Sequence, residues 1–341
     1  MAEQMQAWVL TKPGPIEASL VQQSIPRLTQ PLKPDQVLIK TLRASINPAD
    51  YKAPELGIAS RAMLTYPKTI GMDCSGEVVS IGDKAKEIGG LEVGDRVMAR
   101  IAPFSAAGAL GEYTSVERDG GLAKVPADFD MDQAAGAPTV GLTAIQSIKP
   151  YVKPGDKIFI NGGSGGVGTC GIQVAKLLDC SVTVSCSTGK IDLCKSLGAD
   201  EIIDYTKQDV IEALKKTATD SGKLFDHVVD MVGHSPNNLA QNVHHFTTES
   251  AQFVFVGGST KAIGHMGSAL LTPSFLGGPK RKVAALATKN IRTDFELMAG
   301  WMAEGKMKII VDKVFKLEQT SEAYAELKKG KSAGKLIIEI A

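Results

Sequence analysis

The run Asn-Gly-Gly-Ser-Gly-Gly-Val-Gly at 161–168 constrains the fold of this chain more than any other segment. It follows the apolar residues Ile158–Ile160 and precedes a stretch whose apolar residues recur with helical spacing. Gly163, Gly165 and Gly168 therefore form a G-x-G-x-x-G pattern between a predicted strand and a predicted helix. Such a turn needs one glycine for its tight bend, one for a close backbone approach, and one for helix–strand packing.

A turn of this kind predicts a dinucleotide site. The first residues of the helix offer unpaired N–H groups and the positive end of the helix dipole to phosphate groups. A plain glycine-rich surface loop is the alternative interpretation. A second glycine-containing strand end is expected to approach the same cofactor. The residues predicted for these two contacts are Gly163, Ser164, Gly165, Gly166, Val167 and Gly168 in the first, and Val256, Gly257, Gly258 and Ser259 in the second.

The end of the next predicted strand indicates which cofactor binds. An acidic residue about 20 positions after the glycine turn would bind a ribose 2′-hydroxyl, but no Asp or Glu stands in 185–190. Ser187, Thr188 and Lys190 stand there instead and suit a 2′-phosphate, which indicates NADP(H). Tyr205, at a later strand end, is expected to stack on the adenine or to reach the phosphate. The alternatives are a solvated polar loop and a half-buried packing tyrosine.

Composition excludes several classes of protein. The chain has 341 residues, which suggests about two domains, and a net charge of +1, which favours neither nucleic-acid nor membrane partners. No apolar stretch approaches the roughly 20 residues that span a bilayer. The beginning of the sequence lacks signal-peptide character, so a cytoplasmic location is expected. The five cysteines form no C-x-x-C pair, so neither a disulfide framework nor a zinc module is predicted.

The secondary-structure pattern changes along the chain. Residues 1–128 read as short strands punctuated by Gly and Pro, which predicts a β-rich, barrel-like domain for substrate and catalysis. Residues 129–272 alternate strands and helices, which predicts a parallel, doubly wound nucleotide-binding sheet. Residues 273–341 return to a mixed pattern and are expected to complete both parts. The predicted fold class is α/β.

The order of several short motifs resembles a known family. These motifs are Asn-Pro-Ala-Asp-Tyr-Lys at 47–52, Gly-Met-Asp-Cys-Ser-Gly-Glu-Val at 71–78, Val-Gly-Asp-Arg-Val at 93–97, Gly-Leu-Thr-Ala at 141–144 and Leu-Gly-Ala-Asp at 197–200. Together with the glycine turn, the chain resembles the medium-chain dehydrogenase/reductase superfamily, in its quinone oxidoreductase and enoyl reductase branch. The resemblance implies a GroES-like barrel beside a Rossmann domain.

The same resemblance implies that no zinc binds. The zinc-dependent relatives carry a Cys ligand where this chain has Ile46–Asn47, and Gly-His-Glu where it has Gly71–Asp73. The lobe that holds structural zinc there has four cysteines, whereas the interval from Val97 to Gly111 has none. Without a metal to polarise a carbonyl, the expected reaction is hydride transfer from NADPH to quinones or to the activated C=C bond of α,β-unsaturated carbonyls.

The resemblance also implies which residues act at the nicotinamide end. Asn47 is the candidate for positioning the cofactor, Lys52 for binding the ribose or stabilising an enolate, and Tyr51 for donating a proton. Thr143 is expected against the nicotinamide. The alternatives are an ordinary Asn-Pro turn with a solvated lysine, and a threonine bonded within its own helix. Lys335 is interpreted as a strand-edge lysine, with contact to the cofactor as the alternative.

Two other functions stay open at this point. One is a discrete, trans-acting enoyl reductase for an acyl chain bound to a carrier, and the other is a non-catalytic protein that binds NADPH. The oligomeric state is open as well. If the predicted strand at 252–256 is the last of the nucleotide sheet, it pairs across a two-fold axis in a homodimer or is covered in a monomer.

Overall fold

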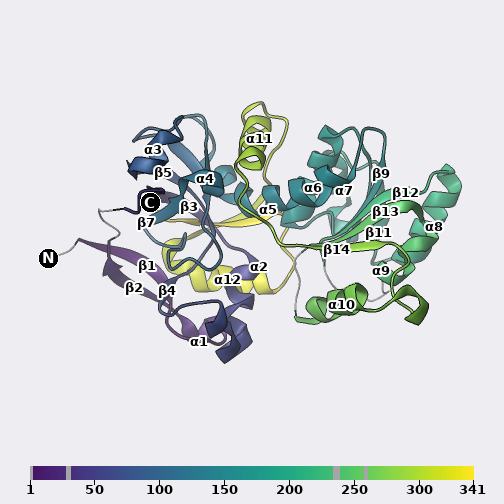
Figure 1. Cartoon of the computed structure of the whole chain (residues 1–341), viewed down its shortest axis with the longest axis horizontal. Helices are drawn as coiled ribbons and strands as arrows, with labels where there is room; N and C mark the ends of the chain where they lie inside the picture. The colour runs from purple at the N-terminus through teal and green to yellow at the C-terminus, as the bar shows by residue number, and fades with distance from the viewer. Residues whose placement is uncertain (1–2, 28–31, 233–238, 257–259) are drawn as a thin grey trace. The chain divides into compact units, whose positions relative to one another are not determined.

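The computed structural model describes residues 3–27, 32–232, 239–256 and 260–341, without the side chains of 260–265. The chain forms two compact units, coloured by residue number in Figure 1. Unit 1 comprises residues 1–142 and 289–341, and unit 2 comprises residues 143–288. These limits lie later in the chain than the predicted boundaries near 128 and 272. The reason is that the long helix α5 (Met131–Ile148) begins in unit 1, and that a further strand joins the nucleotide sheet.

Unit 2 contains the doubly wound parallel sheet that the sequence predicted. Its six strands pair in the order β11-β10-β9-β12-β13-β14, and every neighbouring pair is parallel. The strand order reverses direction between β9 and β12, which is the position where ligands bind in folds of this type. The strands are β9 (Lys157–Asn161), β10 (Ser181–Cys186), β11 (Glu201–Asp204), β12 (Phe225–Asp230), β13 (Thr247–Val256) and β14 (Lys282–Leu286).

Helices cover both faces of this sheet (Figure 1). α8 and α9 bury Leu214 and Leu239 in one apolar cluster with strand residues such as Phe159 and Phe253. α8 begins at Asp209, whose carboxylate accepts the Ile211 and Glu212 N–H groups. The helices and 3-10 turns of unit 2 are η2 (Lys149–Tyr151), α6 (Gly166–Leu177), η3 (Thr188–Lys190), α7 (Ile191–Ser196), α8 (Val210–Ser221), α9 (Leu239–Asn242), η4 (Val243–His245), α10 (Thr260–Leu271) and η5 (Ser274–Leu276).

The edge strand of the sheet comes from the segment 273–341. β13 does not end the sheet, because β14 pairs with it in parallel along Lys282–Leu286. This short strand follows a Gly-Gly-Pro segment and is only partly buried, so its sequence lacks the apolar run that marks an inner strand. The strand at 252–256, considered as a possible last strand of the sheet, is therefore an inner strand.

Unit 1 is rich in β-structure, as predicted. One sheet has the order β15-β16-β3-β5-β6-β8, with β7 also paired to β3, and a second has the order β2-β1-β4. The strands are β1 (Gln4–Leu10), β2 (Leu20–Pro26), β3 (Gln36–Ser45), β4 (Lys68–Thr69), β5 (Asp73–Ile81), β6 (Arg96–Arg100), β7 (Tyr113–Glu117), β8 (Leu122–Lys124), β15 (Val311–Lys316) and β16 (Lys335–Glu339). The helices and 3-10 turns are α1 (Ile16–Ser19), α2 (Pro48–Lys52), η1 (Pro54–Ala62), α3 (Asp83–Glu87), α4 (Arg118–Gly121), the first part of α5, α11 (Arg292–Ala303), η6 (Leu317–Gln319) and α12 (Thr320–Lys328).

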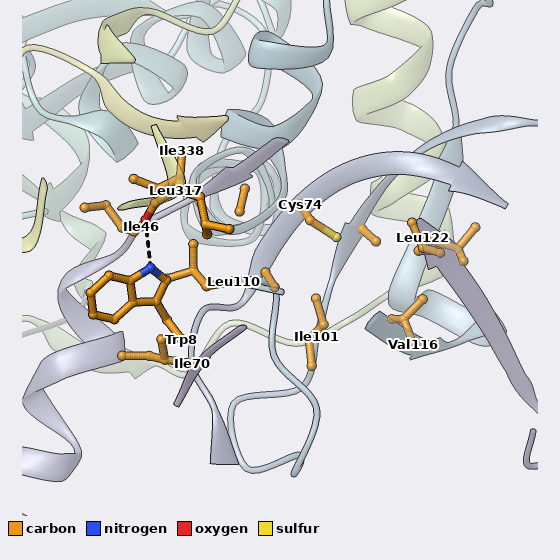
Figure 2. Close-up of a cluster of buried hydrophobic side chains, with 14 of the residues drawn as sticks. Trp8, Ile46, Ile70, Cys74, Ile101, Leu110, Val116, Leu122, Leu317 and Ile338 are labelled. Carbon is orange, nitrogen blue, oxygen red and sulfur yellow. Dashed lines mark hydrogen bonds between the residues drawn. The ribbon is translucent and has the colours of Figure 1, made fainter. Parts of the chain in front are cut away.

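The core of unit 1 joins the two ends of the chain. Figure 2 shows Trp8 of β1 among apolar side chains that include Ile70, Leu110 and Ile338. The Trp8 indole Nε1–H donates to the Leu317 carbonyl oxygen at 2.7 Å, as the dashed line in Figure 2 marks. A buried indole needs such an acceptor, since its N–H otherwise loses its bond to water without replacement.

In the described part of the chain, no helix is both long enough and apolar enough to cross a bilayer.

Candidate active site

The glycine turn joins β9 to α6, and two of its glycines are required by the fold itself. A Cβ on Gly168 would lie 2.1 Å from the Gly162 carbonyl oxygen, and a Cβ on Gly163 would lie 2.7 Å from the Val184 Cβ. Both distances are far shorter than non-bonded contacts allow. At Gly163 the turn packs against β10, and at Gly168 it packs against its own backbone. Neither position has room for a side chain.

Gly165 differs from its neighbours because nothing in the protein crowds it. The nearest atom to a Cβ there would be the Gly162 carbonyl oxygen at 3.7 Å, and its backbone is extended, a conformation open to any residue. Gly165 is the N-cap of α6, and no side chain caps that helix start. The first amide in α6 that donates back to the turn is Thr169 N–H, to Gly165 O. The amides at the start of α6 thus suit a phosphate group.

Side chains beneath the turn hold it in place. The Ser185 hydroxyl donates to Asn161 Oδ1 at 2.6 Å and accepts the Gly162 N–H at 2.9 Å. Asn161 Nδ2 in turn donates to the buried Asp230 carboxylate at 2.9 Å. Three strand ends therefore fix the turn before any ligand binds. None of these three residues was among the predicted site residues, although each stands at the carboxyl end of a predicted strand.

The predicted phosphate pocket contains a carboxylate that the sequence analysis missed. Asp204 ends β11 and pairs in register with Cys186 at the end of β10. Its carboxylate accepts the hydroxyls of Thr188 and Thr206, and these bonds hold its pKa below the usual value. The segment 185–190 itself has no acid, as the sequence shows. The neighbouring parallel strand supplies one, and it orients Thr188.

The other residues predicted for the adenosine end have the following positions in the structure. Ser187 precedes η3, and Thr188 and Lys190 lie within it. No described residue forms an ion pair with Lys190. Tyr205 is 56% exposed, so its ring is not packed into the core. Val256 ends β13, whereas Gly257, Gly258 and Ser259 lie outside the described residues. Thr143 is buried in α5, with its hydroxyl 2.7 Å from that of Thr288.

In unit 1, Asn47 is held from three sides. It caps α2, its backbone N–H donates to Asp50 Oδ2 at 2.7 Å, and its Nδ2 donates to Asp73 Oδ2 at 2.9 Å. Its Oδ1 accepts from the Lys335 ammonium at 2.6 Å. Asn47 is only 3% exposed. The bonds of this side chain are thus made within unit 1, which gives Asn47 the role of fixing the start of α2.

Lys335 is a buried ion, which corrects its interpretation as a strand-edge lysine. Its ammonium donates to the Ile46 carbonyl oxygen at 3.1 Å and lies 3.7 Å from Asp73 Oδ2. Asp73 is completely buried and also accepts the Thr139 N–H and hydroxyl, at 3.1 and 2.7 Å. The negative and positive charges of Asp73 and Lys335 therefore compensate each other away from water.

Asp50 is the second buried carboxyl of this network. The Tyr324 hydroxyl donates to its Oδ2 at 3.1 Å, beside the Asn47 N–H. Burial raises the pKa of Asp50 to about 7, against the opposing effect of the Asn47 N–H, and the nearby Asp73 charge adds to the rise. Asp50 thus titrates in the neutral range.

This shift predicts how stability depends on pH. Between about pH 4, where an unfolded aspartate titrates, and about pH 7, the folded protein binds a proton at Asp50 that the unfolded chain has released. The free energy of unfolding is therefore expected to fall as the pH rises across this window. Asp50→Asn, which mimics the protonated carboxyl, is expected to lessen that fall, as measured by urea unfolding at pH 5 and pH 8. Exposed Asp83→Asn is the control, and an unchanged pH dependence in Asp50→Asn would contradict the assignment.

Tyr51 and Lys52 are the last two residues of α2 and are half-buried. Burial raises the pKa of the Tyr51 hydroxyl and lowers that of the Lys52 ammonium. The Lys328 ammonium lies 5.1 Å from the centre of the Tyr51 ring. No described residue forms an ion pair with Lys52. Asn47 and Asp50 fix the helix that carries both side chains.

The described residues do not fit a zinc ion. No three His, Cys, Asp or Glu side chains among them are grouped as metal ligands. Asn47 and Asp73 stand where the zinc-dependent relatives bind metal, and here both are bonded to the Lys335 ammonium or lie beside it. The Lys335 ammonium therefore lies beside the Asp73 carboxylate that could otherwise serve as a metal ligand.

Comparison with known proteins agrees with this architecture. Residues 33–127 match the family described as alcohol dehydrogenase GroES-like domain, and residues 197–338 match the family described as zinc-binding dehydrogenase. Trans-enoyl reductase pgmF of Aspergillus terreus is 40% identical over 349 residues, which cover 98% of this chain and 96% of that protein. The 2-methylene-furan-3-one reductase of Solanum lycopersicum is 30% identical over 98% of this chain and 79% of that protein.

Among solved structures, the quinone oxidoreductase from Coxiella burnetii superimposes with a TM-score of 0.82 at 26% identity, covering 99% of this chain and 100% of that one. Fold, glycine turn and relatives together define an oxidoreductase that uses a nicotinamide cofactor. The chain belongs to the medium-chain dehydrogenase/reductase superfamily, in the branch of quinone oxidoreductases and enoyl reductases. The predicted family and the predicted GroES-like and Rossmann folds are confirmed.

Proposed function

We propose that this protein is an NADPH-dependent, zinc-independent reductase of quinones or of the activated C=C bond of α,β-unsaturated carbonyl compounds. The observation that carries the proposal is the Lys335 ammonium at the Asn47–Asp73 position, since it leaves no donor set for a Lewis-acidic metal there. Conjugate reduction suits such a site because the developing negative charge spreads into an enolate that hydrogen bonds can stabilise. The tomato relative is named for reducing an enone, and the Aspergillus relative for reducing an enoyl group.

The protein's own groups would bind the cofactor and stabilise charge. A bound reduced nicotinamide would supply the hydride. The open backbone at Gly165 and the amides that begin α6 would hold its pyrophosphate. The proposed donors to the substrate oxygen are the Lys52 ammonium and the Tyr51 hydroxyl, with Asn47 fixing the helix that carries them. A partly desolvated ammonium stabilises an enolate more strongly than one in water does.

The cofactor preference is proposed from Ser187, Thr188, Lys190 and Tyr205. Lys190, with no ion pair to a described residue, is the group that would bind a 2′-phosphate. One residue argues for NADH rather than NADPH. The Asp204 carboxylate could accept a hydrogen bond from a ribose 2′-hydroxyl, which NADH has and NADPH lacks. Two threonine hydroxyls already donate to that carboxylate, however, and this leaves the phosphate-binding role to the half-buried Lys190.

The choice between these cofactors predicts the effect of a Lys190 variant. Lys190→Ala is expected to raise the dissociation constant for NADPH by about tenfold or more, because a charge-assisted bond contributes roughly 1.5–3 kcal/mol. Binding of NADH should change little. Titration of the quenching of protein fluorescence by each cofactor measures both values. Lys195→Ala, an exposed lysine of α7, is the control. Equal weakening of NADPH and NADH binding would contradict a phosphate contact.

Turnover tests the reaction class. We expect consumption of NADPH with enones, enals or quinones, little consumption of NADH, and no loss of activity after treatment with a chelator. Activity with carrier-linked or coenzyme A enoyl thioesters alone would favour the second candidate, a trans-acting enoyl reductase, whose basis is the name of the Aspergillus relative. Binding of NADPH with no turnover of any of these compounds would favour a non-catalytic protein and overturn the proposal.

A further inference from the structure

A run of large apolar side chains is exposed at the end of α10 and in η5. Leu271 and Phe275 are each 84% exposed and Leu276 is 67% exposed. Single exposed apolar residues are common on protein surfaces, but a contiguous group of this size marks a site of interaction. The three residues come from six consecutive positions of unit 2, so they form one feature of one unit.

The backbone of this segment is built to present these side chains. The Leu276 and Gly278 N–H groups both donate to the Pro273 carbonyl oxygen at 3.0 Å, and the Gly277 N–H donates to Ser274 O at 3.2 Å. A Cβ on Gly278 would lie 1.8 Å from the Thr272 carbonyl oxygen, so the turn closes too tightly for any side chain there. Phe275 and Leu276 therefore stand at the tip of a hydrogen-bonded turn.

Basic groups follow this tip directly. Lys280, Arg281 and Lys282 come next in the sequence, and unit 2 has no Asp or Glu from residue 250 to residue 288. The Arg281 guanidinium bonds Thr247 at 3.2 Å and is thereby fixed at the surface of the sheet edge. Burial lowers the pKa of His244, and the charges of His245, Lys280 and Arg281 lower it further, so these basic groups lie near one another. Although the net charge of the whole chain is only +1, the surface around residues 280–282 is strongly basic.

We propose that the surface formed by residues 270–282, the basic tip, docks on an anionic lipid bilayer. Apolar side chains flanked by Lys and Arg match the two layers of a membrane interface, where acyl chains lie beneath negatively charged headgroups. This departs from the expectation, drawn from net charge alone, that the protein has no membrane partner.

Charge distinguishes the bilayer from a second copy of the chain. A two-fold interface sets the same patch against itself, so the three basic residues 280–282 would face their own copies. Glu249 on the neighbouring strand supplies one negative charge against these three positive ones. An acidic protein would satisfy the charge, but it would also need a pocket shaped for Phe275 and Leu276. A fluid bilayer accepts protruding side chains without such a pocket, and therefore fits both observations.

Flotation with lipid vesicles tests the proposal on the whole chain. We expect the wild-type protein to float with vesicles of phosphatidylcholine and phosphatidylserine, but not with phosphatidylcholine alone, and to be released at high salt. Lys280→Glu with Lys282→Glu should lower the partition coefficient by about tenfold or more. Phe275→Ser with Leu276→Ser, which leaves the charge unchanged, should lower it at low salt as well. The matched controls are Lys84→Glu and Val93→Ser, which are exposed in unit 1 and should bind as the wild type does.

All four positions of the two test variants are exposed or lie in a strand edge, and unchanged melting temperatures will confirm that the variants fold. Absence of wild-type flotation, or equal flotation with uncharged vesicles, overturns the proposal. A dimer in sedimentation equilibrium that dissociates in Phe275→Ser with Leu276→Ser assigns the surface to a second copy. Binding to immobilised polyglutamate through the same residues, without vesicle binding, assigns it to an acidic protein.

Discussion

Replacing Lys335 by methionine is expected to lower the free energy of unfolding of unit 1 by about 3–5 kcal/mol, the usual cost of removing one partner of a buried ion pair. Lys335 is 4% exposed and Asp73 is completely buried, so the variant removes the ammonium beside that carboxylate and leaves only the more distant Arg100 to compensate it. It also removes a donor from Asn47 Oδ1 and from Ile46 O. Both tryptophans of the chain lie in unit 1, so their fluorescence during urea unfolding reports on this unit.

Two further variants make the measurement specific. Lys313→Met removes an exposed ammonium that pairs with Glu326 at 2.8 Å, and should cost no more than about 1 kcal/mol. Adding Asp73→Asn to Lys335→Met removes the carboxylate charge and should restore part of the loss. A loss below about 1 kcal/mol in Lys335→Met, equal to that of Lys313→Met, would show that the buried pair does not hold unit 1 together.

The second large effect concerns the glycine turn, where two alanine variants should fail in different ways. Gly165→Ala is expected to leave folding intact and to weaken NADPH binding by about 30-fold, or about 2 kcal/mol, because its methyl group occupies the space left for a phosphate. Gly168→Ala is expected to destabilise unit 2, because its Cβ would lie 2.1 Å from the Gly162 carbonyl oxygen.

Thermal unfolding and cofactor titration of both variants separate these effects. The expected result is a melting temperature close to that of the wild type for Gly165→Ala and a clearly lower one for Gly168→Ala. If Gly165→Ala binds NADPH as tightly as the wild type, the turn does not hold the pyrophosphate. Gly165 would then be an ordinary surface glycine.

The parts of the fold that sequence could predict are those set by local patterns. The glycine turn lies within eight residues, and its strand and helix adjoin it, so its conformation follows from neighbours in the chain. The alternation of strands and helices likewise predicts the parallel sheet and its switch point. β14 was missed because it is short, half-buried and preceded by Gly and Pro, so its apolar pattern is weak.

Contacts between distant residues were not predictable in this way. Lys335 and Asn47 are 288 positions apart, and a lysine in a predicted strand is usually at the surface, so only the packed fold reveals the buried ion. Asp204 entered the predicted phosphate pocket through the register of β10 with β11, which pairs Cys186 with it. The sequence could predict Asp50 as a helix cap, but its raised pKa depends on burial beside Asp73.

The most direct test of the proposed reaction follows the transferred hydrogen. NADPH carrying deuterium at C4 of the nicotinamide is incubated with the protein and an α,β-unsaturated ketone, and the product is analysed by NMR. The account predicts a saturated ketone with one deuterium at the β-carbon. Deuterium at the carbonyl carbon of an alcohol product would contradict it and indicate a carbonyl reductase.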